Sequence, residues 1–197
     1  MAPLGYSWRS AKWFIITCIT IALFSENFLY SYIVPILPVM LTERLHIDPS
    51  EVQYTTSLVL STNAFVSLLT AIPTGYLADK IPSRQVSLLA SLGLEAIGTL
   101  VIVFATNIPL LLVGRSIQAV GGNAAWIVGI ATISDAVGQE NTGKTMGVVS
   151  SFFLSGLLFG PMFSGTLLGL VGYWPTWMFA IAVLVIDMLL RVVMIEG

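Results

Sequence analysis

Cysteine and histidine are almost absent from this 197-residue chain, which holds one of each, Cys18 and His46. A single cysteine cannot form a disulfide framework or a cysteine-based metal site, and one histidine cannot build a zinc centre. The sequence also contains no nucleophile with a neighbouring base and no loop that would cradle phosphate, so it does not resemble an enzyme. We therefore expect neither catalysis nor a bound metal or cofactor.

Charge is scarce as well. Only 9% of the residues are charged, the formal net charge is -2, and lysine and arginine do not cluster. Binding to nucleic acid takes a basic face, so nucleic acid is excluded as a partner. In contrast, 56% of the residues are hydrophobic, which leaves too little polar surface for a water-soluble globule of this size. The chain is predicted to be an all-α integral membrane protein, with the lipid bilayer as its surroundings.

The apolar residues divide into about six stretches that could cross a bilayer. Each crossing needs roughly 20 residues for a hydrocarbon core of about 30 Å. Short turns such as Thr106-Asn107 and Gly172-Tyr173 separate several stretches, which predicts antiparallel neighbouring helices. The expected spans are Trp13 to Leu41, Val52 to Leu77, Val86 to Ala105, Ile108 to Ser134, Thr145 to Leu170 and Trp174 to Ile195.

The basic residues predict the orientation. With a cytoplasmic amino terminus, only Arg44 lies outside and Arg115 within a span, and the others gather at the inner face. The inner residues are Arg9, Lys12, Lys80, Arg84, Lys144 and Arg191. We therefore expect a cytoplasmic segment at 1–12, a single bundle at 13–195, and both termini in the cytoplasm. The first apolar run is interpreted as a span and not as a signal peptide, because no small-residue cleavage site precedes Glu26.

A mixed-charge hairpin joins the second and third expected spans. Its residues are Gly75, Leu77, Asp79, Lys80, Pro82 and Arg84, with apolar or small residues between them. The glycine permits close helix approach, and the acid with its bases forms a polar latch at the cytoplasmic mouth. The alternative is a solvated loop whose bases follow the positive-inside rule.

The fifth span carries small residues at helical spacing. They are Gly147, Gly156, Gly160, Ser164 and Gly165, with Pro161 among them. Glycines three or four residues apart place one helix backbone against another, and proline removes a hydrogen bond, so this helix should pack closely and bend. The alternative is a face for helix dimerisation, which Gly165 and Gly169 would also serve.

Arg115 lies several residues inside the fourth span, where an unpaired charge costs a few kcal/mol or more. At about 1.5 Å per residue, its depth in the bilayer matches that of Glu26 in the first span. We expect the two to meet at a polar site, with Asn27, Asn63, Gln118 and Asn123 as supporting donors and acceptors. Burial favours neutral Glu26 and a nearby arginine favours its charged form, so Glu26 is the candidate titrating carboxylate. A structural ion pair would explain the same two residues.

Two further acids are expected to be structural. Glu95, inside the third span, is interpreted as a hydrogen-bonded acid and not as a coupling site. Asp187 and Arg191 are four residues apart in the last span, so they should pair on one face and anchor the helix at the interface.

The hairpin, the fifth-span glycines and the run Arg115-Ser-Ile-Gln118-Ala119 resemble three motifs of the major facilitator superfamily. The resemblance covers nearly the whole chain and is strongest to fungal drug and amine proton antiporters. The chain departs from these patterns at Pro82, Ala119 and Ser164, and at Thr142 in the loop between the fourth and fifth spans, where the family has an arginine. The resemblance implies that the chain is the amino-terminal six-helix half of a usual twelve-helix transporter. This half would be built from two inverted three-helix repeats, with 196–197 at the start of a central linker.

This resemblance implies alternating-access transport of small organic molecules, with proton-coupled export of drugs or amines and a proton gradient as the energy source. It implies a plasma, vacuolar or vesicular membrane. Two alternatives stay open. The chain could be a half-transporter that needs a second bundle, from another copy or a partner, or a truncated membrane protein that transports nothing.

Overall fold

The computed structural model describes residues 11–81, 83–137 and 142–194. Arg9, Pro82, most of the segment expected at 1–12 and the linker residues 196–197 lie outside the described residues. Six helices in the described part are long and apolar enough to cross a membrane. They are α2 (Lys12–Tyr32), α4 (Pro49–Lys80), α5 (Arg84–Val103), α6 (Ile108–Val137), α7 (Thr142–Val171) and α8 (Tyr173–Val193). The expected all-α architecture with six spans is confirmed.

The first span is not the single helix expected from Trp13 to Leu41. Helix α2 ends at Tyr32, and a turn leads into the short helix α3 (Ile36–Val39) and a π-helical segment, η1 (Met40–Arg44). Pro35 explains the break, because it has no N–H and its ring would collide with the carbonyl of Ser31 four residues earlier. That carbonyl instead accepts a bond from the amide of Val34 at 3.1 Å.

Local signals set the other helix boundaries. Asp48 caps α4 by accepting a bond from the Ser50 amide at 2.8 Å, and Pro49 occupies the first turn. Hydrogen bonds from the Ser50 hydroxyl and amide lower the pKa of Asp48 below its ordinary value. Ser83 caps α5 in the same manner. Gly172 separates α7 from α8 with a φ of 82°, a left-handed conformation that favours glycine.

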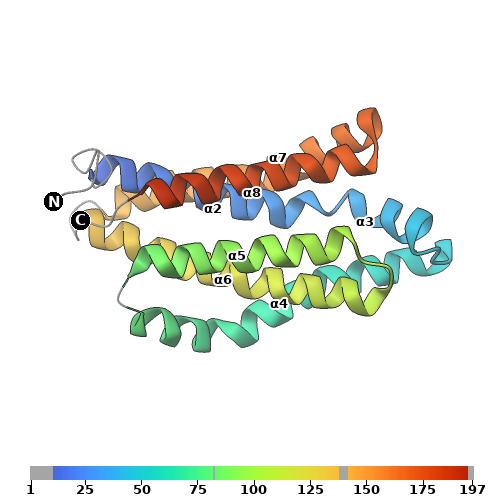
Figure 1. Cartoon of the computed structure of the whole chain (residues 1–197), viewed down its shortest axis with the longest axis horizontal. Helices are drawn as coiled ribbons and strands as arrows, with labels where there is room; N and C mark the ends of the chain where they lie inside the picture. The colour runs from blue at the N-terminus through green and yellow to red at the C-terminus, as the bar shows by residue number, and fades with distance from the viewer. Residues whose placement is uncertain (1–10, 82, 138–141, 195–197) are drawn as a thin grey trace.

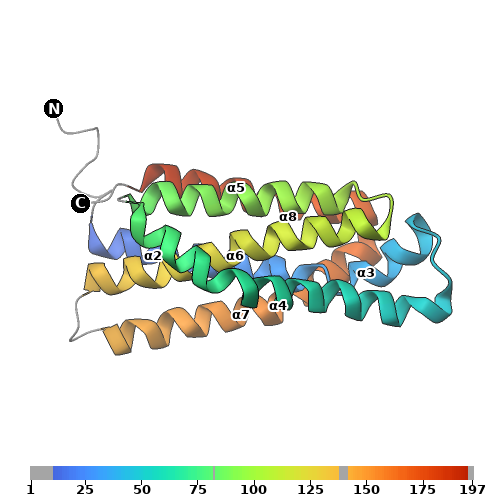
Figure 2. The ribbon, with the colours of Figure 1, turned by 90° about the horizontal axis from the view of Figure 1, so that it is seen from below.

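The helices run side by side in an elongated bundle (Figures 1 and 2). The start of α2, the end of α8 and the turn between α4 and α5 lie at one end of the bundle. The α5–α6 and α7–α8 turns lie at the other end, together with α3. Lys12, Lys80, Arg84 and Arg191 therefore share one end, as the charge pattern predicted.

The helix contacts show an internal two-fold relationship. Helix α2 packs mainly on α7, and α4 packs on α6. Let α2 correspond to α6, α4 to α7 and α5 to α8. The α2–α7 contact then corresponds to the α4–α6 contact, and the α5–α6 contact corresponds to the α2–α8 contact. This is the pattern that two repeats of three helices would produce.

Two glycines of α7 allow this helix to approach the α2 backbone closely. A Cβ placed at Gly156 of α7 would lie 2.6 Å from the backbone oxygen of Phe24 in α2. One at Gly160 would lie 2.5 Å from the oxygen of Phe28 and would collide with the Ser31 hydroxyl. The close packing expected of the fifth span is therefore present, and its partner is α2 of the same chain.

Other glycines of the two motifs are not used in this way. A Cβ at Gly75, Gly147 or Gly169 would meet no atom within 4 Å, and one at Gly165 would make ordinary contact with Pro35 at 3.7 Å. The close approach expected at Gly75 is thus not made by the residues that the structure describes. Pro161 lies inside α7 without ending the helix.

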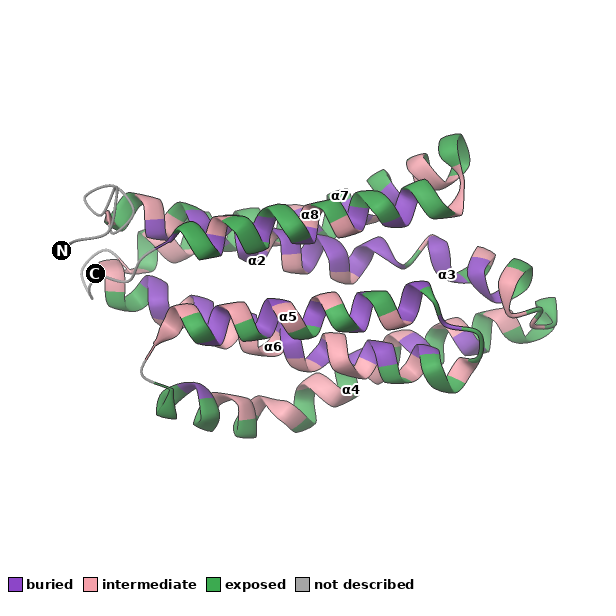
Figure 3. Ribbon diagram, in the orientation of Figure 1, coloured by how far each residue is buried: buried purple, intermediate pink, exposed green. Residues whose placement is uncertain are grey.

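Burial is uneven among the helices (Figure 3). In the most apolar stretch of α2, 61% of the residues are buried, whereas the corresponding stretches of α4 and α7 are each 17% buried. Their exposed side chains are mainly large and apolar, among them Phe65, Leu68, Ile72, Leu158 and Met162. Helices α4 and α7 therefore present the bundle's two least covered apolar surfaces.

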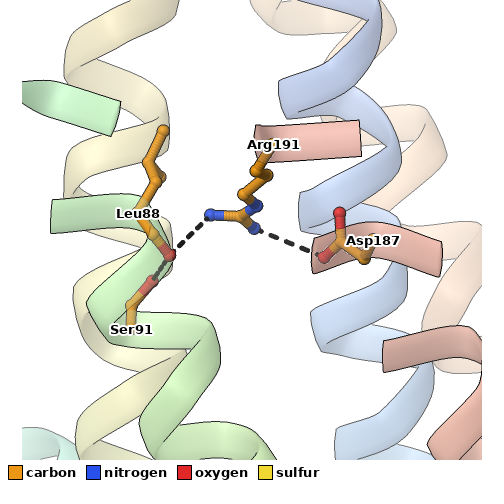
Figure 4. Close-up of polar contacts among 4 residues, drawn as sticks. All are labelled: Leu88, Ser91, Asp187 and Arg191. Carbon is orange, nitrogen blue, oxygen red and sulfur yellow. Dashed lines mark hydrogen bonds and ion pairs between the residues drawn. The ribbon is translucent and has the colours of Figure 1, made fainter. Parts of the chain in front are cut away.

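A buried ion pair ties α8 to α5 (Figure 4). Arg191 and Asp187 lie 3.5 Å apart, and each is 1% exposed. Arg191 also donates to the backbone oxygen of Leu88 in α5 at 3.3 Å. The expected i, i+4 pairing is present, but the pair lies inside the bundle and does not anchor α8 at the membrane interface.

We expect Gly160→Ala to destabilise the fold by about 1–3 kcal/mol, because the new methyl group would push α7 away from the α2 backbone. Thermal unfolding in detergent, followed by tryptophan fluorescence, measures the change. Gly169→Ala on the same helix is the matched control and should leave stability unchanged or raise it by up to about 1 kcal/mol, because alanine favours the helix. Equal melting temperatures for the two variants would contradict the proposed helix contact.

Asp187→Asn should destabilise the protein by about 3 kcal/mol, since it leaves the Arg191 guanidinium buried without a charged partner. The double variant Asp187→Leu with Arg191→Met removes both charges and should unfold closer to the wild-type temperature than the single variant. The same unfolding assay measures both. A double variant less stable than Asp187→Asn would show that hydrogen bonding by Arg191 outweighs the cost of burying its charge.

Candidate functional site

A small polar cavity lies between α2, α4, α5 and α6. Its volume is about 30 Å³, which holds water but no organic molecule. The lining residues are Glu26 and Tyr30 of α2, Asn63 and Ser67 of α4, Glu95 of α5, and Arg115, Gln118, Ala119, Gly122 and Asn123 of α6. The cavity is therefore lined by charged and amide side chains inside an apolar bundle.

Arg115 is fully buried at this cavity and only partly satisfied. One guanidinium nitrogen donates to the Gln118 amide oxygen at 2.9 Å, and the guanidinium lies 5.3 Å from the centre of the Tyr30 ring. Its Nε and second terminal nitrogen have no hydrogen-bond partner among the residues that the structure describes. Gln118 in turn donates to the Thr99 hydroxyl of α5 at 2.7 Å. The arginine is thus held by one amide, with two nitrogens left for a further acceptor.

Two carboxyl groups flank a pair of glycines in α6. A Cβ at Gly122 would lie 2.5 Å from Oε1 of Glu26, which reaches α6 from α2. A Cβ at the preceding Gly121 would lie 3.1 Å from Cγ of Glu95, which reaches α6 from α5. Side chains at these two positions would block both acids. The glycine pair therefore allows acidic side chains from two helices, α2 and α5, to approach adjacent positions of α6.

Glu95 was predicted to be a hydrogen-bonded structural acid and not a coupling site. The structure contradicts the hydrogen bonding at one carboxyl oxygen, and the role of the residue stays a prediction. The residue is 6% exposed and lines the cavity, and its Oε2 has no partner in the described part of the chain. An acid in the middle of an apolar helix is itself a signal of a polar site. The neighbouring Gly121–Gly122 pair could have strengthened that signal, since it leaves space for a side chain from the next helix.

Five of the six residues expected at the polar site line the cavity, and Asn27 does not. The buried amide of Asn27 instead donates to the backbone oxygen of Phe153 in α7 at 2.6 Å. Asn63 donates to the backbone oxygen of Arg115 at 3.5 Å, and Asn123 donates to that of Ser67 at 3.0 Å. The expectation fails for Asn27 because adjacent positions on a helix point to different faces.

Glu26 and Arg115 meet at the cavity without forming the direct ion pair that was one of the alternatives. Among the described residues, the salt bridges within 4.0 Å are Arg84–Asp135 and Arg191–Asp187. The charge of Arg191 acts on both Glu26 and Glu95. The cavity therefore brings opposite charges close together and leaves them available to water or a ligand.

In the described part of the charged hairpin, the bases make side-chain contacts and the acid makes no ion pair. Arg84 pairs with Asp135 of α6 at 3.5 Å, and the Lys80 ammonium lies 4.3 Å from the centre of the Tyr76 ring. Asp79 and Leu77 are exposed, and Asp79 makes no ion pair within the described ranges. The hairpin thus fastens α5 to α6, while its acid faces outward.

Comparison with known proteins gives consistent results. The sequence profile of the Major Facilitator Superfamily matches residues 19–195. An uncharacterized MFS-type transporter of Schizosaccharomyces pombe is 37% identical over 183 residues, which are 93% of this chain and 41% of that protein. The probable vesicular acetylcholine transporter-A of Danio rerio is 29% identical over 174 residues, covering 80% of this chain and 34% of that protein. The chain thus spans about two-fifths or less of the length of these relatives.

The fold is also found in a solved structure. The crystal structure of PepTSo, a POT family transporter, matches 90% of this chain and 36% of that chain with a TM-score of 0.72. The sequences are 14% identical, so this likeness concerns the fold alone. With the family profile matching most of its length, this multi-pass membrane chain belongs to the Major Facilitator Superfamily of transporters.

Proposed function

We propose that this chain carries the cavity of a membrane transporter that exchanges small organic cations, such as amines or cationic drugs, for protons by alternating access. The observation that carries this proposal is the cavity itself, whose lining includes two acids, Glu26 and Glu95, and one base, Arg115. A site with more carboxylates than guanidiniums favours a cationic ligand. The zebrafish relative, named for acetylcholine, supports the same class of substrate.

Glu26 is the proposed coupling carboxylate. It lies on α2, at the glycine step of α6, and its carboxyl group makes no hydrogen bond or ion pair with the residues that the structure describes. Glu26 is half-buried. A partly buried carboxyl without fixed partners binds a proton readily, and a cation nearby favours its release. Proton and substrate would therefore compete for the same charge.

Transport requires the cavity to enlarge and to open alternately to each side. At about 30 Å³ it is too small for an organic cation in this conformation. In transporters built from two bundles, one bundle rocks against the other around a site between them. The poorly covered faces of α4 and α7 are the surfaces available for such a second bundle. We propose that it comes from a further part of the polypeptide, another copy or a partner chain.

The end of the bundle that holds Lys80 and Arg84 is proposed to face the cytoplasm, with both termini on that side. Lys12, Lys80, Arg84 and Arg191 lie at this end, as the positive-inside rule requires. Exposed Asp79 would then be the half of the latch that is free to engage a second bundle. A plasma, vacuolar or vesicular membrane is compatible with this proposal.

Glu26→Gln should abolish exchange driven by a pH gradient. Purified protein is reconstituted into vesicles with an acidic interior, and uptake is measured for monovalent cations of graded size, from acetylcholine to tetraphenylphosphonium. Glu51→Gln, an exposed acid in the first turn of α4, is the matched control and should leave uptake unchanged. Undiminished uptake by Glu26→Gln would exclude this residue as the coupling group, and a wild-type protein that moves none of the cations would overturn the proposed function.

If the uncovered faces of α4 and α7 pair with a second copy, the detergent-purified protein should have the mass of a dimer. Light scattering coupled to size exclusion measures the protein mass. Leu68→Lys and Leu158→Lys place charges on the exposed faces of α4 and α7 and should each convert the dimer to monomer. Leu94→Lys, which charges an exposed position on α5, is the control. A monomeric wild-type protein that still exchanges cations would refute the requirement for a second bundle.

A further inference from the structure

Among the described residues, the charged groups that are buried within the helices or line the cavity include more acids than bases. The acids are Glu26, Glu95 and Asp187, and the bases are Arg115 and Arg191. Three carboxylates against two guanidiniums leave one negative charge without a balancing cation when all five groups are ionised. An uncompensated charge is expensive in an apolar bundle, so the missing positive charge has to be supplied.

The geometry locates that charge at the cavity. Asp187 and Arg191 already form a buried pair, which leaves Glu26, Glu95 and Arg115 as the cavity's own charged groups. Oε2 of Glu95 and two nitrogens of Arg115 are buried there without partners in the described part of the molecule. A side chain that is so deeply buried and unpartnered at a cavity indicates a site for a small ligand.

The two acids act on each other. They approach neighbouring glycines of α6 from two helices, α2 and α5, and line the same small cavity. Arg191 and Asp187 of α8 are the other charged groups that act on these acids, and because the two are paired with each other they add no net charge to the set. Helix α4 supplies neutral groups to the same cavity, Asn63 and Ser67, and α2 supplies the Tyr30 ring. One proton or one monovalent cation would thus neutralise the whole set.

We propose that Glu95 is the second carboxyl group of the binding site, and that Glu26 and Glu95 together hold one exchangeable proton, which is released when a monovalent organic cation enters. This deepens the proposed function by adding a residue and a stoichiometry. In the empty site, one carboxyl carries the proton and the other faces Arg115. Entry of the cation breaks that O–H bond, the proton passes to water, and the net charge of the site stays the same.

A shared proton leads to a prediction that would not follow if Glu95 had only a structural role. Without Glu95, Glu26 and Arg115 balance each other, so the site needs no proton and gains a positive charge when it binds a cation. Glu95→Gln and Glu26→Gln should therefore be equivalent: each abolishes proton release and weakens cation binding at least tenfold. Removing Arg115 in addition restores one uncompensated carboxylate, so Glu95→Gln with Arg115→Gln should regain both properties.

Proton release is measured with a pH-sensitive dye in weakly buffered detergent solution as tetraphenylphosphonium is added to the purified full chain. Calorimetry in the same solution gives the affinity. Wild type should release one proton per cation bound, and Glu51→Gln should match it. Circular dichroism and size exclusion establish that each variant is folded.

A second measurement needs no organic ligand. Infrared spectroscopy of the carboxyl C=O stretch should detect one protonated carboxyl group in the wild-type bundle at neutral pH. The band should vanish in Glu95→Gln and in Glu26→Gln, and return in the double variant with Arg115→Gln. A band unaffected by Glu95→Gln would overturn the shared proton, and so would a double variant that fails to recover it while remaining folded.

The two proposals can fail separately. If the infrared band follows the charge balance but no cation is bound or moved, the shared proton stands and the transport of organic cations falls. If cations exchange for protons in vesicles while Glu95→Gln behaves as wild type, transport stands and the role of Glu95 falls.

Discussion

Close approach of helix backbones at glycine is the constraint on which this bundle depends. In a lipid environment, apolar side chains gain little by leaving the solvent, so helices associate through tight packing and interhelical polar contacts. Gly156 and Gly160 bring α7 onto α2, and Gly121 brings α5 onto α6. Glu26 of α2 and Glu95 of α5 thereby meet α6 at the adjacent positions Gly122 and Gly121. The location of the charges thus follows from the small residues, and not from attraction between the charged groups themselves.

The bundle contains two groups of charged residues, and they differ in how far their spacing depends on the positions of neighbouring helices. Asp187 and Arg191 are one turn apart on a single helix, so their pairing is set by α8 and persists if neighbouring helices move. Glu26, Glu95 and Arg115 come from three helices, and their spacing depends on how α2 and α5 sit against α6. Movement of these helices would change the cost of ionising the two acids. Only the second arrangement can therefore couple charge to conformation.

Much of this fold could be predicted from the sequence, because apolar length determines a membrane helix almost by itself. The six spans and the i, i+4 pair of Asp187 with Arg191 follow from such local rules. The broken first span was missed, although Pro35 is a local signal, because continuous hydrophobicity outweighed it. Asn27 was placed at the cavity by proximity to Glu26, whereas helical rotation turns it toward Phe153. Glu95 could not be assigned from α5 alone, since its surroundings come from α2 and α6.

The uncovered faces and the small cavity are two consequences of the same architecture. Helices α2 and α6 bury much of their surface inside the bundle, so they can hold charged groups in fixed positions. Helix α4 contributes Asn63 and Ser67 to the cavity yet leaves most of its apolar surface exposed. A partner that packs on α4 would therefore press directly on a wall of the site. In such an arrangement, α4 would carry both the surface that receives a second bundle and part of the cavity wall, so movement of the partner would act directly on the cavity.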